Sequence, residues 1–258
     1  MDTQSSRRLF LSASTLVGAN ALLSACRPAT NVGPDNAYAS GAAPAQHAAN
    51  TKAEDGKGSA EEVTATEDLM REHGILRRAL VVYRECAIKL RASPASVSPG
   101  ALQRTAKLFR AFGEDYHERK LEEAYIFPAV KGAGGLAAGY ADILLAQHQR
   151  GREITDYILA ATQAPKIGAN AQALAVVLES FARMYEPHTA IEDTIVFPAW
   201  KQTMSPKQLD EMGDKFENIE HDQFGKDGFE DAVQQIAAIE ATLGLSDLAQ
   251  FTAPAPPA

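Results

Sequence analysis

Apolar residues recur at intervals of three and four along four long stretches of the chain, which is the period of an α-helix. The first stretch stops before Ser93 and Pro94. The second follows Ser98 and Pro99, where the serine suits an N-cap and the proline a first turn. This second helix is predicted to run to about Phe127 and to be ended by the proline and glycines that follow it.

The third stretch ends before Pro165, and the fourth has the most regular pattern. Two shorter amphipathic helices are predicted after Ser205 and Pro206, and no segment alternates as a half-buried strand does. We therefore predict an all-α fold. It consists of an antiparallel four-helix bundle over residues 61–203, additional C-terminal helices over 204–251 that pack on the bundle, and a disordered tail over 252–258.

Polar residues interrupt the apolar faces of these helices at matching places. Each helix carries one histidine on the face that the period assigns to the core, and the second and fourth helices add a glutamate. The segments EEAYIFPAV and EDTIVFPAW, which begin at Glu122 and Glu192, repeat this order. The six candidate ligands are His73, His117, Glu122, His148, His188 and Glu192.

Burying imidazoles and carboxylates without partners costs several kcal/mol, and a cation can offset that cost for all of them together. His188 and Glu192 are one helical turn apart and so face the same way. If two ions take about six ligands each, four histidines and two bridging glutamates leave about four positions, which a bridging oxo or hydroxo group and open sites would fill. The pattern predicts a two-metal site with room for a small molecule.

The residues that carry this pattern resemble a known family. The segments LMREHGILRR, YHERKLEEAYIFP, LLAQHQRGR and PHTAIEDTIVFP are similar to the four helices of the hemerythrin-like HHE cation-binding family. The resemblance extends from Glu67 to Trp200 and implies a non-haem centre of two iron ions, although nitrogen and oxygen ligands also suit manganese or zinc. By the same resemblance the four histidines would be terminal iron ligands and the two glutamates carboxylate bridges.

The second helix departs from the family pattern. His117 and Glu122 are five residues apart, about 140° around an ideal α-helix, where the family usually has four. A local π-bulge would restore the facing geometry. Otherwise Glu118 or Glu123 would take the place of Glu122. Position 152 is arginine where oxygen-carrying members have a further histidine, so the site resembles that of the iron-repair and iron-sensing relatives.

Composition and charge limit the kinds of partner that we expect for this chain. The 258 residues carry a formal charge of −8 with 45% hydrophobic residues, which suits a packed core and argues against nucleic-acid binding. Arg7 and Arg8 precede a moderately apolar stretch that ends in Leu-Ser-Ala-Cys, which resembles a twin-arginine export signal with a lipobox at Cys26. Residues 1–26 are therefore predicted to be an export signal and residues 27–60 a disordered tether.

These features together predict an exported, periplasmic or cell-envelope protein that reaches the membrane only through a lipid on Cys26. We expect it to bind or reduce a small oxidant such as dioxygen, peroxide or nitric oxide, with electrons from a redox partner. A metal-sensing, redox-sensing or iron-storage module without turnover is the alternative, and a bundle without metal is a third. His221 is expected to lie outside the ligand set, and Glu72 is expected to be a solvated neighbour of His73. The two Phe-Pro pairs are expected to close the bundle end, with Pro128 and Pro198 stopping their helices.

Overall fold

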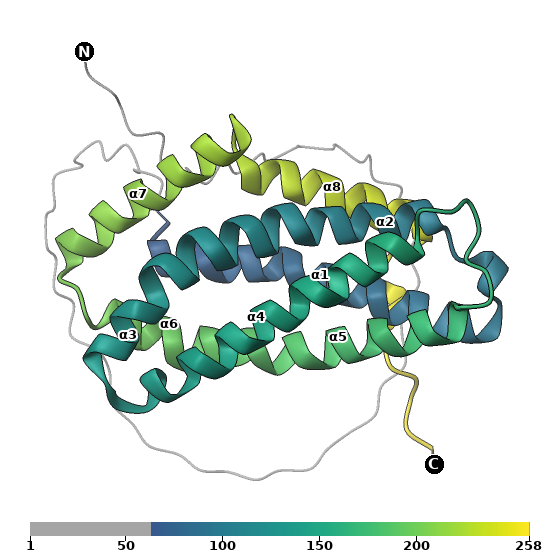
Figure 1. Cartoon of the computed structure of the whole chain (residues 1–258), viewed down its shortest axis with the longest axis horizontal. Helices are drawn as coiled ribbons and strands as arrows, with labels where there is room; N and C mark the ends of the chain where they lie inside the picture. Colours follow the sequence, from purple (N-terminus) through teal and green to yellow (C-terminus); the bar gives the residue numbers. More distant parts are fainter. Residues whose placement is uncertain (1–62, 258) are drawn as a thin grey trace, which may run out of the picture. The chain divides into compact units, whose positions relative to one another are not determined.

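A computed structural model describes residues 63–257, and all the regular secondary structure in that range is helical (Figure 1). Helix α1 spans Ala65–Ala92. It begins at Thr64, whose side chain accepts from the backbone N–H of Glu67 while that glutamate bonds back to the Thr64 N–H. This capping box satisfies two of the backbone groups that a helix start leaves open. A short 3₁₀ turn, η1 (Pro94–Ser96), follows.

Each of the four long helices of the bundle is a continuous helical stretch, which we call a rod, and α1 is the first. The second rod has three parts: α2 (Pro99–Leu108), the π-helical segment η2 (Phe109–Ile126) and α3 (Phe127–Ala133). The predicted start is correct, because Ser98 caps the helix and Pro99 occupies its first position. The predicted end at Phe127 is wrong, because the helix continues through Pro128; it ends at Ala133, where Gly134, one of the predicted glycines, is the C-cap. The N–H of Phe127 bonds to the carbonyl of Glu122, five residues back. This wider π-turn accommodates the proline that would interrupt an α-helix.

The third rod is α4 (Gly135–Ala161), and the fourth consists of α5 (Ala171–Ile191), the π-turn η3 (Glu192–Val196) and α6 (Phe197–Lys201). The fourth rod, like the second, has a π-turn just before a Phe-Pro pair. The Phe197 N–H bonds to the Glu192 carbonyl, and the helix continues through Pro198 to Lys201, so the predicted stop at this proline is also wrong.

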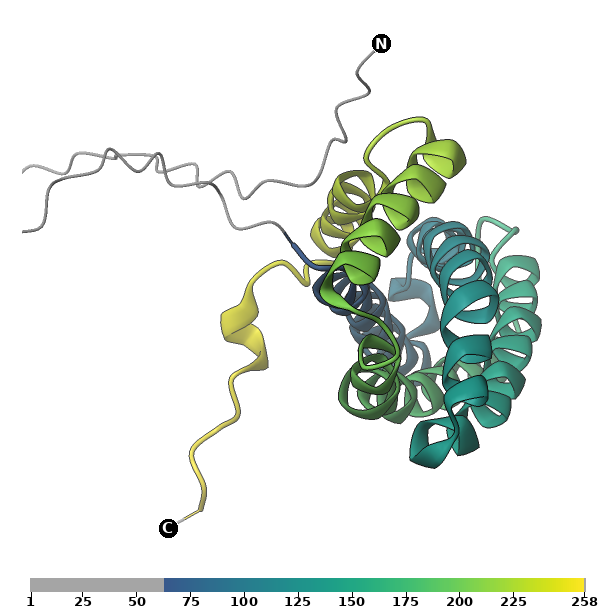
Figure 2. The same ribbon diagram turned by 90° about the vertical axis from the view of Figure 1, so that its left-hand side faces the viewer.

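The four rods lie alongside one another and form the predicted bundle (Figures 1 and 2). The core is continuous from the start of α1 to α8. Next to the histidines it contains an aromatic layer of Tyr83, Phe109, Phe181 and Tyr185, with ring centroids 4.6 to 6.5 Å apart. This layer fills the bundle with large, well-packed side chains on one side of the polar centre.

Two further helices follow as predicted, α7 (Pro206–Phe224) and α8 (Gly228–Leu243), and a 3₁₀ turn, η4 (Leu248–Phe251), comes after them. Both helices pack on the bundle. Phe216 of α7 stacks on Trp200 of α6 with ring centroids 5.6 Å apart. Arg78 of α1 makes a bidentate pair with Glu240 of α8. None of the helices in the described range is long and apolar enough to cross a membrane. The predicted export signal and tether lie outside the described residues.

Candidate metal centre

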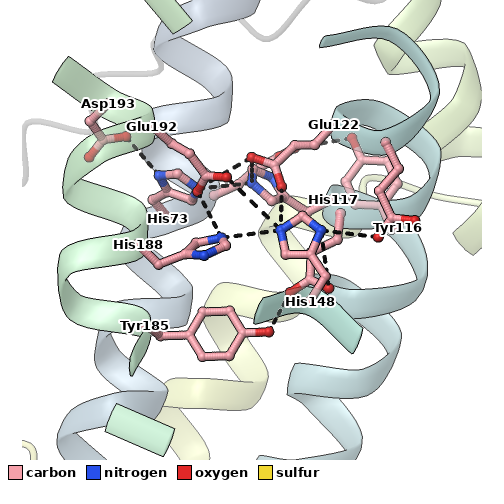
Figure 3. Close-up of polar contacts among 12 residues, drawn as sticks. His73, Tyr116, His117, Glu122, His148, Tyr185, His188, Glu192 and Asp193 are labelled. Carbon is pink, nitrogen blue, oxygen red and sulfur yellow. Dashed lines mark hydrogen bonds and ion pairs between the residues drawn. The ribbon is translucent and has the colours of Figure 1, made fainter. Parts of the chain in front are cut away.

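The six predicted ligands converge inside the bundle (Figure 3). Each of the four rods contributes one histidine, and the second and fourth each add a glutamate. All six side chains are buried. They form two groups that share Glu122: one with His73 and His117, the other with His148, His188 and Glu192.

The histidines form two pairs whose Nε2 atoms face each other. The Nε2 atoms of His73 and His117 are 3.0 Å apart, and those of His148 and His188 are 3.1 Å apart. We call the first pair half A and the second pair half B. Ligands bound at about 2.1 Å to a six-coordinate ion lie about 3 Å from one another when adjacent. The spacing within each half therefore fits a shared cation.

The two glutamates lie between the halves. Glu122 Oε1 is 3.3 Å from His117 Nε2, and its Oε2 is 3.3 Å from His148 Nε2. Glu192 Oε2 is 3.1 Å from His188 Nε2 and 3.5 Å from His73 Nε2. None of the four carboxylate oxygens has a well-formed hydrogen bond, although all are buried. Buried oxygens without donors are costly, and cations bridged by both carboxylates would remove that cost.

The outer nitrogen of each ring is bonded to an oxygen from another residue. The Nδ1 atoms of His73, His117, His148 and His188 lie 2.6 to 3.0 Å from oxygens of Asp193, Glu72, Glu123 and Gln147, respectively. An imidazole that donates from Nδ1 keeps its Nε2 lone pair for a metal. All four rings are thus oriented as metal ligands are.

Sequence reasoning missed these outer partners. Glu72 was expected in solvent, but it is buried and binds both His117 and Tyr116. Asp193 and Glu123 each pair with an arginine, Arg77 and Arg152. The sequence repeat could have indicated these partners. An acid directly follows Glu122 and Glu192, and Glu72 and Gln147 each directly precede the histidine on the first helix of a hairpin.

The alternatives to Glu122 have other partners. Glu118 accepts from the Tyr185 hydroxyl at 2.7 Å and from Arg152 at 3.2 Å. Glu123 bonds to the outer nitrogen of His148. These two acids and His148 could themselves surround a cation, but of Glu118, Glu122 and Glu123 it is Glu122 that reaches the Nε2 atoms of both halves. The π-turns of η2 therefore place Glu122 at the centre, although it follows His117 by five residues. His221 is exposed on α7.

Burial and neighbouring charges shift the ionisation of these groups in opposite directions. Burial lowers the pKa of His188 well below its usual value and also lowers the pKa of His73. Burial acts the same way on His117, but Glu122 and Glu72 outweigh it and raise the pKa of that ring well above its usual value. Burial, reinforced by Glu122, raises the pKa of Glu192 well above its usual value. Without metal the site is therefore a set of shared protons.

Comparison with known proteins agrees with this arrangement. The Hemerythrin HHE cation binding domain matches residues 64–200. The chain is 47% identical over 192 residues to uncharacterized proteins of Mycobacterium bovis and of Mycobacterium tuberculosis strains CDC 1551 and H37Rv, with 74% of each chain covered. No solved structure matches the chain significantly. The matched region holds all six buried candidate ligands, and the chain belongs to the hemerythrin HHE cation-binding domain family.

Proposed function

We propose that this protein holds two iron ions without haem and uses them to bind or reduce a small oxidant such as dioxygen, peroxide or nitric oxide. The observation that carries the proposal is the convergence of four Nε2 atoms on two buried carboxylates whose oxygens have no well-formed hydrogen bond. The protein alone offers these buried oxygens no well-formed hydrogen bond. Two cations, oxo- or hydroxo-bridged, would satisfy all of them.

In this proposal each half supplies two imidazoles, and Glu122 and Glu192 each offer carboxylate oxygens to both halves. An iron pair bound there would supply electrons by passing between ferrous and ferric states and would offer an open coordination position. Manganese or zinc would meet the same nitrogen and oxygen atoms. The family resemblance favours iron.

The surrounding chain shields the centre and orients its ligands. The Phe197 ring stacks on His73 with centroids 5.2 Å apart, and the Phe127 ring stacks on His148 at 5.4 Å. The two Phe-Pro phenylalanines therefore cover one ligand in each half and exclude water from it. On the other side the Tyr185 hydroxyl donates to Glu118 Oε1, which holds a proton close to His148 without exposing the site to solvent.

We also propose that the protein is exported to the cell envelope and anchored by a lipid on Cys26. The support is the twin-arginine pattern at Arg7 and Arg8 and the Leu-Ser-Ala-Cys segment that ends at Cys26. Labelling cells with a fatty-acid analogue would test the anchor. Label incorporated into the native chain but not into Cys26→Ser is expected, and equal labelling of both would contradict it.

The function is tested by metal analysis together with an absorption spectrum of the purified protein. We expect about two iron ions per chain and near-ultraviolet charge-transfer bands of a bridged ferric pair, both lost in His188→Ala. His221→Ala is the matched control, because His221 is an exposed histidine on α7 and should leave the spectrum unchanged.

Turnover separates the proposal from its alternative. Iron-loaded protein supplied with a reductant should consume peroxide or nitric oxide over many cycles, or bind dioxygen reversibly. A change in the packing of α7 and α8 without binding or consumption would instead indicate a sensing or storage module. Protein that contains no stoichiometric metal and cannot be reconstituted would refute the metal function altogether.

A further inference from the structure

The two halves of the centre are related by the sequence repeat, so their surroundings can be compared position by position. In each half a histidine from the first helix of a hairpin faces one from the returning helix: His73 faces His117, and His148 faces His188. If every equivalent position carried the same residue, two ions bound there would be equivalent.

The partners of the first histidine match in the two halves. His73 is bonded through Nδ1 to Asp193, and His148 to Glu123. Each of these carboxylates also pairs with an arginine four residues after the histidine, Arg77 in half A and Arg152 in half B. One carboxylate and one cation are therefore present at the same place in both halves.

The partners of the returning histidine differ. His117 Nδ1 lies 2.6 Å from Glu72 Oε2, and the Tyr116 hydroxyl donates to the other oxygen of that carboxylate at 3.0 Å. His188 Nδ1 lies 2.8 Å from Gln147 Oε1. Glu72 and Gln147 each directly precede the first histidine of their half, so they are equivalent positions with different charge.

Glu118, another buried acid near half B, does not supply the carboxylate that His188 lacks. Glu118 Oε2 is 3.9 Å from His148 Nδ1, beyond hydrogen-bond distance. Its two oxygens accept from the Tyr185 hydroxyl and from Arg152. The equivalent position in half A is Thr189, a neutral residue. In half A both imidazoles are thus bonded directly to carboxylates, whereas in half B only one is.

A carboxylate bonded to the outer nitrogen makes an imidazole a stronger donor to its metal, which favours the more highly charged ion. Accordingly, we propose that Glu72 and Gln147 make the two iron ions inequivalent, so that in the half-reduced protein the ferric ion is in half A and the ferrous ion in half B. This inference rests on the proposed di-iron function. The half-reduced state would then be stable, and the electron available to an oxidant would lie beside His148 and His188.

A reductive titration of the iron-loaded full chain with dithionite, followed by Mössbauer spectroscopy, tests this arrangement. Each of the two steps adds one electron from dithionite to one ferric ion. In the native protein half B is reduced first and half A second. Glu72→Gln should make half A easier to reduce, and Gln147→Glu should make half B harder to reduce. Either change should lower the constant for forming the half-reduced state by about tenfold.

The double variant Glu72→Gln with Gln147→Glu is the most decisive test, because it exchanges the residues bonded to the outer nitrogens of His117 and His188. It should restore much of the separation between the two reduction steps. Glu67→Gln is the matched control, since it removes the same charge from α1 at a residue bonded only to its N-cap. Circular dichroism of each variant checks that the bundle is intact.

Three results would overturn the inference. In the first, the two iron ions of the native protein are reduced together. In the second, the single variants leave the separation between the two reduction steps unchanged, and in the third, the double variant shows no larger separation than either single variant. In all three the iron pair, and with it the proposed function, would survive. A native chain that binds no iron pair would overturn both.

Discussion

Metal binding to this centre should release about three protons, and so should become much tighter as the pH rises. The reason lies in the facing histidine pairs. Two Nε2 lone pairs 3.0 or 3.1 Å apart repel each other unless a proton or a cation lies between them. Burial opposes a charge on His117 and on His148, but neighbouring carboxylates raise the pKa of both rings well above its usual value.

Each half therefore holds one proton when no metal is bound, because burial keeps the partner rings, His73 and His188, neutral by lowering their pKa values. A third proton is on Glu192, whose pKa is raised well above its usual value by burial and by Glu122. Glu122 is ionised, since His117 and His148 outweigh its burial and hold its pKa well below the usual range. We therefore expect one proton each on His117, His148 and Glu192.

Two ions that displace about three protons give an overall binding constant that rises by about three powers of ten per pH unit. This corresponds to about 4 kcal/mol per pH unit for the two ions together. The assay is an anaerobic competition between the protein and a coloured chelator for ferrous ion between pH 6.5 and 7.5. Calorimetry in buffers of different ionisation enthalpy counts the released protons directly.

Glu192→Gln removes one titrating group and should lower the count to about two, whereas the exposed His221→Ala should not change it. A binding constant independent of pH would refute the shared-proton account of the metal-free site. The metal-free fold has its own pH dependence. Raised pKa values for His117 and His148 mean that their contribution to stability is present below the unfolded value of 6.5 and is lost as the pH rises through the folded values.

Three further predictions concern stability and can be read from urea unfolding of the metal-free protein. Gly151→Ala should cost about 1 to 3 kcal/mol, because its Cβ would clash with the Tyr185 hydroxyl, while Gly139→Ala in the same helix has open space and should not destabilise. Burial raises the pKa of Glu114 to about 7, so its ionisation should lower the free energy of unfolding by up to about 3 kcal/mol as the pH rises from 4.5 to 7. Glu114→Gln should remove this part of the pH dependence. Thr64→Ala should cost about 1 kcal/mol by removing the cap of α1, and an unchanged midpoint would contradict the role of the capping box.

The helices of this fold could be predicted because their boundaries depend on local chemistry. Helix α1 ends at Ala92 before Ser93 and Pro94, and α2 begins at Pro99 under a cap from Ser98, as the residues indicated. The continuation of the helices through Pro128 and Pro198 could not be predicted from the same rules. Those rules assume α-helical bonds to the fourth residue back, whereas the preceding turns bond to the fifth.

The candidate ligands could be identified from periodicity, since that property fixes which face of a helix a side chain occupies. Periodicity does not fix how a ring is turned or which oxygen meets its outer nitrogen. Glu72 shows the difference. It is next to His73 in the sequence, yet its carboxylate bonds to His117 on another helix, and its burial follows from the close approach of α1 and η2. Such contacts depend on tertiary packing and leave little trace in a single helix pattern.

The repeated Glu-x-x-x-x-Phe-Pro segment explains why the metal centre and the π-turns occur together. In both copies the phenylalanine N–H bonds to the carbonyl of the central glutamate, and the phenylalanine ring stacks on the first histidine of the opposite hairpin. The acid after the glutamate bonds to that same histidine. An α-helical turn would rotate carboxylate and ring about 140° apart, whereas a π-turn keeps both directed at the centre. Each segment thus positions its own glutamate and the other hairpin's histidine at once, so neither hairpin can form its half of the centre alone.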